Sequence, residues 1–227
     1  MTNTPNLQPG QEGFMSTKTK ATQTRYDYYD LVMHVTARGK AIYGPHFEIE
    51  DIDRPIVLKL LTYFLRDERV ALDEGIDLNK GILLTGKIGC GKTSLISIIR
   101  NLSQEAFKPA IISCRDISFE FGKMGYDVIA KYSKNAFYPY TSIPRIHCFD
   151  DLGLETTIKF WGNDCNVMAE ILLSRYDLLI SHKMLTHVTT NLVSQELEDL
   201  YGNRLRSRMR AMFNLIAFDA GTKDKRR

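Results

Sequence analysis

The chain has 227 residues, of which 44% are hydrophobic and 25% are charged, and it carries 30 Lys and Arg against 27 Asp and Glu. This composition is typical of a globular protein, and the length suits a single α/β domain with a large core. A formal net charge of +3 is too small to indicate a nucleic-acid-binding protein by itself. The sequence has no run of 18 apolar residues and no hydrophobic leader. We therefore expect a cytoplasmic protein with neither a membrane span nor a secretory signal.

The first part of the chain divides into two stretches of different composition. Residues 1–24 contain few apolar side chains among many Thr and Asn, and we expect them to form a disordered tail. An N-terminal extension is expected over residues 25–52. Its apolar residues recur close to helical spacing over 28–35, and we expect Gly39 and then Gly44-Pro45 to interrupt this helix.

A second helix begins the core domain, which we expect to extend over residues 53–220 before a basic tail at 221–227. Asp53 is expected to cap this helix, and Pro55 suits its first turn. The apolar residues that would share one face of the helix are Ile56, Val57, Leu60, Leu61, Phe64 and Leu65.

Short apolar runs then alternate with longer helical periodicities, a pattern typical of a parallel sheet covered by helices. Strands are predicted over 81–85, 110–114, 146–149, 186–190 and 213–218. Helices are predicted between them over 92–107, 115–132, 164–181 and 194–210. The segment 133–144, which contains two prolines, is expected to be a loop. The four cysteines lack metal-ligand spacing, and we expect reduced, buried thiols at Cys90, Cys114, Cys148 and Cys165.

The most informative segment follows the first predicted strand of the sheet. It reads Gly86-Lys87-Ile88-Gly89-Cys90-Gly91-Lys92-Thr93 and fits G-x-x-x-x-G-K-[ST] at each fixed position. Glycines let backbone N–H groups turn onto phosphates, and the helix that follows presents its positive end to the same anion. We expect this loop and Ser94 to bind ATP, with Lys92 on the β- and γ-phosphates and the Thr93 hydroxyl on Mg²⁺. The alternative is a glycine-rich turn with an incidental lysine.

Two carboxylates end the third predicted strand of the sheet. Asp150 and Asp151 follow Lys92 by 58 and 59 residues. This gap fits a helix, a strand and another helix, so we expect a P-loop protein in which an extra strand separates the two nucleotide-binding strands. Asp150 is expected to contact hydrated Mg²⁺, and Asp151 to act as general base or to orient water. The alternative is a solvated turn after a strand.

A polar residue, Asn191, ends the next predicted strand. If this strand neighbours the acidic one, the Asn191 amide would lie close enough to hydrogen-bond the attacking water or the γ-phosphate. Asparagine is also common in turns, so a structural role is the alternative.

Arginines occur at every second position near the end of the chain, at Arg204, Arg206, Arg208 and Arg210. On a helix Arg204 and Arg208 would share one face, with the other two about 200° around it. One pair could reach a γ-phosphate bound to a neighbouring subunit, and the other could contact DNA phosphates. The alternative is a solvated basic helix face. A second basic cluster ends the sequence at Lys223, Lys225, Arg226 and Arg227.

The ordered set of these motifs resembles AAA+ ATPases of the DnaC/DnaI helicase-loader and IstB transposition-helper group. The resemblance extends from about residue 53 to residue 218. It is carried by Gly-Ile-Leu-Leu-Thr-Gly-Lys-Ile-Gly-Cys-Gly-Lys-Thr, Cys-Phe-Asp-Asp-Leu-Gly, Val-Thr-Thr-Asn-Leu and Gly-Asn-Arg-Leu-Arg-Ser-Arg-Met. It implies an α/β fold with a five-stranded parallel sheet of the additional-strand type, and no helical lid after the last strand.

The resemblance also implies roles for individual residues. Asp150 and Asp151 become the Walker B pair and Asn191 becomes sensor 1. Arg208 becomes the arginine finger, with Arg204 as its neighbour in the same motif. The pair Arg175-Tyr176 matches an Arg-Tyr pair often found on the helix before the sensor strand, and its role is left open.

We therefore expect a Mg²⁺-dependent AAA+ ATPase that forms a homo-oligomer with ATP between its subunits. It would act on DNA, single-stranded in our expectation, together with a helicase or a transposase-like protein. Asp151 stands where many AAA+ enzymes have Glu, so we expect slow hydrolysis, stimulated by assembly or DNA. The residues that contact adenine are expected within 42–52.

Two other function classes are weighed against this one. A P-loop small-molecule kinase would need basic residues in a lid, and the loop over 133–144 has few of them. An adaptor that assembles on DNA with ATP and hardly hydrolyses it would carry the same motifs.

Overall fold

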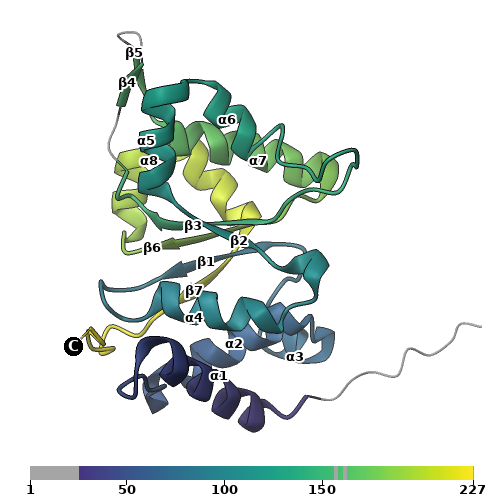
Figure 1. Ribbon diagram of the computed structural model, residues 1–227, viewed down its shortest axis with the longest axis vertical. Coiled ribbons are helices and arrows are strands. Elements are labelled where there is room, and N and C mark those ends of the chain that lie inside the picture. The colour runs from purple at the N-terminus through teal and green to yellow at the C-terminus, as the bar shows by residue number, and fades with distance from the viewer. Residues whose placement is uncertain (1–25, 156–157, 161–162, 227) are drawn as a thin grey trace, which may run out of the picture.

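The computed structural model describes residues 26–155, 158–160 and 163–226, so the tail predicted over 1–24 lies outside the described residues. A five-stranded sheet separates two layers of helices (Figure 1). Its strands are β1 (Gly81–Thr85), β2 (Ala110–Ser113), β3 (His147–Leu152), β6 (Thr186–Thr190) and β7 (Phe213–Ala217). These are the five strands predicted from the sequence.

The order of the strands in the sheet is β2-β3-β6-β1-β7, and each neighbouring pair is parallel. Strand β6 therefore lies between β1, which leads into the glycine-rich loop, and β3, which carries the acidic pair. This confirms the extra strand predicted from the spacing of the motifs. Parallel strands end at the same edge, so the segments that follow β1, β3 and β6 all meet there.

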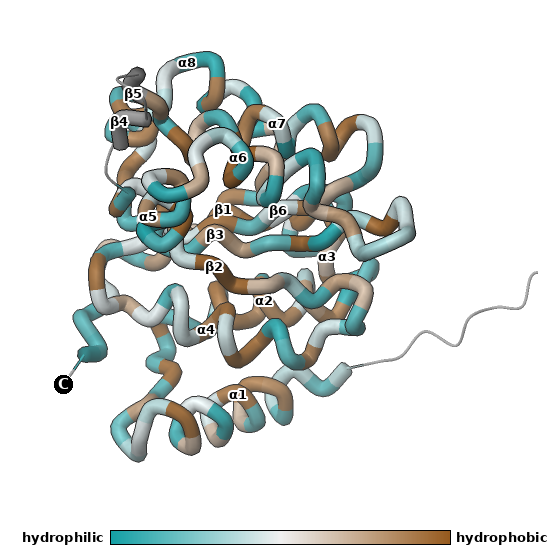
Figure 2. Tube along the Cα trace, turned by 45° about the horizontal axis from the view of Figure 1, so that its top comes forward, coloured by the Kyte–Doolittle hydropathy of each residue, from teal (hydrophilic) through white to brown (hydrophobic). Residues whose placement is uncertain are grey.

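The two faces of the sheet are covered by different parts of the chain. One layer contains α1 (Tyr28–Tyr43), α2 (Arg54–Leu65), α3 (Glu68–Asp73) and α4 (Lys92–Ile99). The other contains α5 (Cys114–Met124), α6 (Asp127–Tyr132), α7 (Val167–His182) and α8 (Ser194–Met212). Side chains of β1 alternate between them: Ile82 and Leu84 belong to the core of the first layer and Leu83 to that of the second. Figure 2 shows the strands of the sheet, with hydrophobic segments in β2 and β3, enclosed between these layers.

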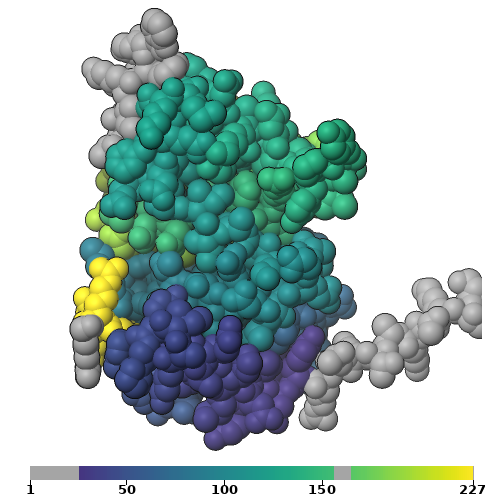
Figure 3. Space-filling view, viewed as in Figure 1, coloured from purple at the N-terminus to yellow at the C-terminus, as the bar shows by residue number. Residues whose placement is uncertain are grey.

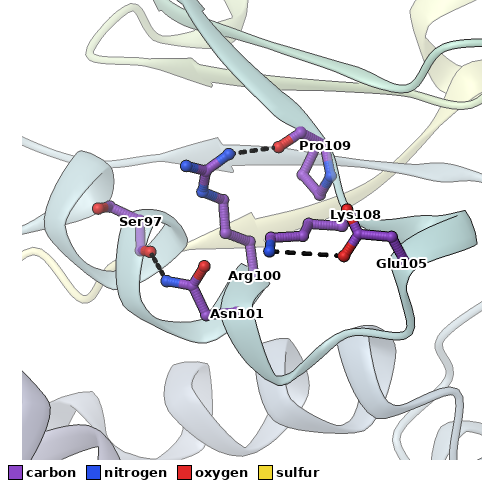
Figure 4. A network of polar contacts seen from close by, with 6 residues as sticks. All are labelled: Ser97, Arg100, Asn101, Glu105, Lys108 and Pro109. Atoms are coloured by element: carbon purple, nitrogen blue, oxygen red, sulfur yellow. Dashed lines mark hydrogen bonds and ion pairs between the residues drawn. The ribbon is translucent and has the colours of Figure 1, made fainter.

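The helix predicted over 92–107 is shorter than expected. Helix α4 ends at Ile99, and two short 3₁₀ helices, η2 (Arg100–Leu102) and η3 (Glu105–Phe107), lead toward β2. Figure 4 shows how polar groups hold this turn: the Arg100 guanidinium donates to the carbonyl of Pro109 at 2.7 Å, and the Asn101 amide donates to that of Ser97 at 2.9 Å. The helix predicted over 115–132 is likewise divided into α5 and α6 at Gly125, whose φ is +63°.

Helix α1 continues through Gly39, where an interruption was predicted. A Cβ atom at Gly39 would lie 2.1 Å from the ring of Phe47, so glycine is required there by close packing and not by a turn. The helix ends at Tyr43, before Gly44. The prediction that Gly39 breaks the helix was therefore wrong.

A small antiparallel hairpin of β4 (Ile158–Phe160) and β5 (Asn163–Cys165) was not predicted. It precedes α7, which begins at Val167 because Asn166 caps it: the Asn166 side-chain oxygen accepts from the Ala169 N–H at 3.0 Å. The predicted start at residue 164 was three residues early. All four cysteines are free and buried, as expected. Among the described residues, no helix combines the length and apolar character needed to cross a membrane.

Candidate functional site

The glycine-rich loop joins the end of β1 to the start of α4. Gly89 and Gly91 have φ values of +81° and +99°, a backbone region in which glycine carries no steric penalty. Lys92 begins α4 and is 5% exposed. Its ammonium group donates to the carbonyl oxygens of Gly86 at 2.7 Å and Lys87 at 3.0 Å. The local sequence thus places a buried cation at the positive end of a helix, in a loop shaped for an anion.

The first turn of α4 meets the end of β3 through Thr93 and Asp150. The Thr93 hydroxyl is 2.9 and 3.1 Å from the two carboxylate oxygens of Asp150. The Thr189 hydroxyl, on β6, donates to the same carboxylate at 2.6 Å. Burial raises the pKa of Asp150, against the lowering effect of these two hydroxyl groups. The two residues expected to hold Mg²⁺ therefore lie in direct contact, although 57 residues separate them in the sequence.

Asp151 and Asn191 lie at the same edge of the sheet. The register of β3 against β6 shifts between Phe149 and Leu152, and Asp151 adopts a positive φ of +57°. The Asp151 N–H donates to the Thr189 hydroxyl at 2.9 Å. Asn191 follows the last residue of β6. The strand order shows that β6 neighbours β3, which carries the acidic pair, so the condition set for Asn191 is met. Its side chain has no hydrogen-bond partner among the described residues.

A cavity of about 600 Å³ opens beside the glycine-rich loop. The loop and the start of α4 form one wall, and Asp151 lies at its edge. A second wall comes from the end of α1 and the loop after it, including the Tyr43 and Phe47 rings, which stack 5.8 Å apart. Apart from Lys40, this second wall comes from residues 42–52, where adenine contacts were expected. A third wall, formed by residues 223–226, was not foreseen.

The four arginines lie on the last part of α8, after a break at Gly202 (φ 79°, ψ 159°). Arg206 forms an ion pair of 2.5 Å with Glu198, on the other side of this break. Arg208 lies 5.2 Å from the centre of the Tyr176 ring and donates to the carbonyl of Arg204 at 3.4 Å. None of the four arginines is among the described residues that line the cavity. Within one chain, the structure does not bring them to the glycine-rich loop.

Two solved structures resemble this arrangement of strands, loop and helices. The DnaC helicase loader has a TM-score of 0.50 and 15% sequence identity, with 77% of this chain and 95% of that chain covered. DnaI has a TM-score of 0.51 and 20% identity, with 79% and 87% covered. The chain has a DnaC/DnaI-like AAA+ fold. At these identities the similarity establishes the AAA+ fold alone.

Sequence comparison identifies fewer similar proteins than structural comparison does. An uncharacterized protein of Acanthamoeba polyphaga mimivirus is 49% identical over 45 residues. That match spans 20% of this chain and only 14% of the viral protein. No protein-family model matches the sequence.

Arg175, whose role the sequence left open, is a structural element of this AAA+ fold. It is fully buried, and its Nε donates to the Thr186 hydroxyl at 2.6 Å. Its Nη1 donates to the carbonyl of Tyr132 at 2.9 Å, and its Nη2 to those of Leu185 at 2.8 Å and Arg145 at 3.1 Å. Burial lowers the pKa of Arg175 to about 9. The guanidinium joins α6 to the amino ends of β3 and β6, on the side of the sheet away from the cavity.

Sequence reasoning missed two residues of the site. Thr189 contacts both members of the acidic pair, and its local signal in the sequence was a polar residue two positions before Asn191, within the strand β6. Asp53 was expected to cap α2, but its side chain makes no capping hydrogen bond. Instead this fully buried carboxylate accepts from the Thr222 hydroxyl at 3.0 Å and pairs with Lys225. Asp53 thus occupies the predicted N-cap position of α2, but its side chain does not cap the helix, because its partners lie at the other end of the chain.

Proposed function

We propose that this protein binds ATP with Mg²⁺, hydrolyses it slowly and acts on DNA, as a helicase-loader-like or mobile-element helper ATPase. The observation that carries the proposal is the meeting of Lys92, Thr93 and the acidic pair at one edge of the sheet. The AAA+ fold supports it, since a structural neighbour is described as a helicase loader.

The loop from Gly86 to Ser94 would hold the phosphates. Its backbone N–H groups and the start of α4 would face the bound phosphates, and the Lys92 ammonium would exchange its carbonyl contacts for phosphate oxygens. The base would lie toward the Tyr43 and Phe47 rings at the far wall of the cavity.

The residues expected to bind the metal fit Mg²⁺. A hydroxyl and a carboxylate are hard oxygen donors, and Thr93 and Asp150 present them 2.9 Å apart. A bound Mg²⁺ would supply positive charge to the phosphates. Thr189 would keep the Asp150 carboxylate in place through its 2.6 Å hydrogen bond.

Hydrolysis would depend on Asp151 and Asn191. Asp151 would accept a proton from the attacking water, and Asn191 would orient that water or contact the γ-phosphate. The water oxygen then bonds to the γ-phosphorus while the bond to the β,γ-bridging oxygen breaks, and ADP leaves. The shorter Asp side chain at position 151 favours slow turnover.

Assembly would complete the site. Arg208 and Arg204 would act on ATP bound to a neighbouring copy, because they lie away from the cavity of their own chain. Contacts to DNA phosphates are proposed for Arg206 and Arg210. The Arg210 side chain is exposed, whereas Arg206 is engaged by Glu198, so we expect the larger contribution from Arg210.

Phosphate release with and without single-stranded DNA tests this proposal. We expect Asp151→Asn and Arg208→Ala each to lower turnover about 10³-fold while ATP affinity stays within about twofold, because both act on the reaction and not on binding. The matched controls are the exposed residues Asp177→Asn and Arg69→Ala, which should behave as the wild type.

Two results would change the assignment. If the wild type and Asp151→Asn are equally inactive while ATP still drives assembly on DNA, the protein is a non-hydrolysing adaptor. If Arg208→Ala loses ATP binding, the arginine does not act on a neighbour's site.

A further inference from the structure

The segment after the last strand runs back across the glycine-rich loop. Phe218 N–H donates to the carbonyl of Thr85 at 2.8 Å, as the chain leaves β7. Further along, the Lys87 ammonium donates to the carbonyl of Ala220 at 2.5 Å, and Lys225 N–H donates to that of Gly89 at 3.0 Å. Figure 3 shows this segment, in yellow, against the N-terminal layer of the molecule. The C-terminal segment, residues 219–226, is therefore attached to the loop at both ends.

Asp53, the residue before α2, anchors this C-terminal segment. Its carboxylate is fully buried, with one oxygen accepting from Thr222 at 3.0 Å and the other paired with Lys225. Lys225 keeps 24% of its side chain exposed. A buried carboxylate is costly unless it is paired and hydrogen-bonded. Among the described residues, the hydrogen-bond and ion-pair partners of the Asp53 carboxylate all belong to the C-terminal segment, so the position of this segment depends on Asp53.

Gly89 makes the close approach possible. A Cβ atom at this position would lie 1.9 Å from a carboxylate oxygen of Asp224. The same oxygen accepts from the N–H of Arg226 at 2.9 Å, which turns the end of the C-terminal segment toward the cavity. The loop is thus shaped to receive this segment as well as an anion.

Lys223 and Arg226 line the cavity from the C-terminal segment. Both side chains are exposed, and neither forms an ion pair with another residue in the described part of the chain. They face the same space as Lys92 and Asp151. Two exposed cations that no carboxylate of the described residues pairs with, beside a loop suited to an anion, match a ligand with several negative charges.

We propose that the C-terminal segment belongs to the nucleotide site of its own chain. Lys223 and Arg226 contact the phosphates of a bound nucleoside triphosphate, and Asp53 is a positioning residue that acts through Thr222 and Lys225. This inference rests on the proposed nucleotide binding and extends it from the glycine-rich loop to residues at the far end of the sequence.

Binding measurements on the full chain test the contact with phosphates, using a slowly hydrolysed ATP analogue, ADP and adenosine. We expect Lys223→Ala/Arg226→Ala to weaken binding of the ATP analogue about 30-fold, since two charge-assisted contacts are lost. ADP binding should weaken less, and adenosine binding should not change. The matched control, Lys123→Ala/Arg115→Ala, removes two exposed charges from α5 and should bind as the wild type.

The positioning role is tested by Asp53→Asn, Lys225→Met and their combination. Each single variant should weaken binding of the ATP analogue about fivefold. The double variant should weaken it no more than either single variant, because both substitutions remove the same contact between Asp53 and Lys225. A merely structural Asp53 would weaken ATP and adenosine binding alike. Lys225→Met removes a partly exposed group, so it gives a decisive result even if Asp53→Asn does not fold.

The outcomes separate this inference from the proposed function. If the wild type binds none of the nucleotides, the proposed function is wrong and this inference falls with it. If the wild type binds the ATP analogue and Lys223→Ala/Arg226→Ala binds it equally well, nucleotide binding stands and the role of the C-terminal segment is overturned. Additive effects of Asp53→Asn and Lys225→Met would overturn the positioning role.

Discussion

Polar groups meet strands β3 and β6 at both ends, and the two ends differ in how those groups are used. At the amino ends, Arg175 donates to three carbonyls and a hydroxyl and is enclosed by the fold. At the carboxyl ends, Asp150 is held by two hydroxyls and Asp151 lies at the edge of an open cavity. A charged residue whose hydrogen bonds are complete within the fold stabilises it, whereas one that faces a cavity can act on a ligand.

The largest effect on stability is expected at the amino ends of these strands. Arg175→Met keeps the length of the side chain but leaves three carbonyls and the Thr186 hydroxyl without their donor. Unsatisfied buried groups are costly, so we expect the free energy of unfolding to fall by about 3 kcal/mol. Urea unfolding followed by circular dichroism measures this change. At low temperature, where the variant is folded, its ATP affinity should equal that of the wild type.

The matched control is Arg204→Met, on the exposed part of α8, which should change the free energy of unfolding by less than about 0.5 kcal/mol. Equal effects of Arg175→Met and Arg204→Met would show that the buried network contributes nothing. Loss of ATP binding by folded Arg175→Met would show that the two strand ends are not separate in function.

A smaller effect concerns pH. His147, beside Arg175, and His187, on β6, are buried, and burial lowers the pKa of each to about 3. The unfolded chain takes up these protons near pH 6.5, so it binds more protons than the native state below that pH. Their contribution to stability is therefore complete above about pH 6.5 and is lost as the pH falls toward 3, by about 1.4 kcal/mol per pH unit for each histidine.

His147→Phe isolates one of these groups. The free energy of unfolding of this variant should fall less steeply between pH 6 and pH 4.5 than that of the wild type, by about 1.4 kcal/mol per pH unit. Urea titrations at a series of pH values measure both slopes. Parallel slopes would mean that His147 is protonated in the native state or stays neutral in the unfolded one.

Much of the fold follows from local patterns. The short apolar runs predicted all five strands, and the spacing between the Lys92 and Asp150 motifs predicted that an extra strand separates β1 from β3. The structure shows that this strand is β6. Both predictions depend on periodicity and connection length, which one sequence displays directly. The helix ends were less predictable: α4 ends at Ile99 because Arg100 and Asn101 bond to nearby carbonyls, which no apolar period shows.

Residues of the candidate site that form sequence motifs were predicted, and residues whose role depends on contacts distant in the sequence were missed. The glycine-rich loop and the acidic pair could be predicted because each is a contiguous segment with its own pattern. Asp53 was assigned to a helix cap because its true partners, Thr222 and Lys225, are 169 and 172 residues away. Arg175 was left open because burial decides its role, and a single sequence does not display burial at a lone arginine.

We propose above all that the carboxyl edge of the sheet binds a nucleoside triphosphate. Calorimetric titration of the wild type and Lys92→Ala with the ATP analogue and Mg²⁺ tests it most directly. We expect the wild type to bind the ATP analogue and Lys92→Ala to bind it about 100-fold more weakly, because a phosphate-binding cation is lost. The thermal unfolding of the two proteins should be nearly the same. Equal binding by the two proteins, or no binding by the wild type, would contradict the claim.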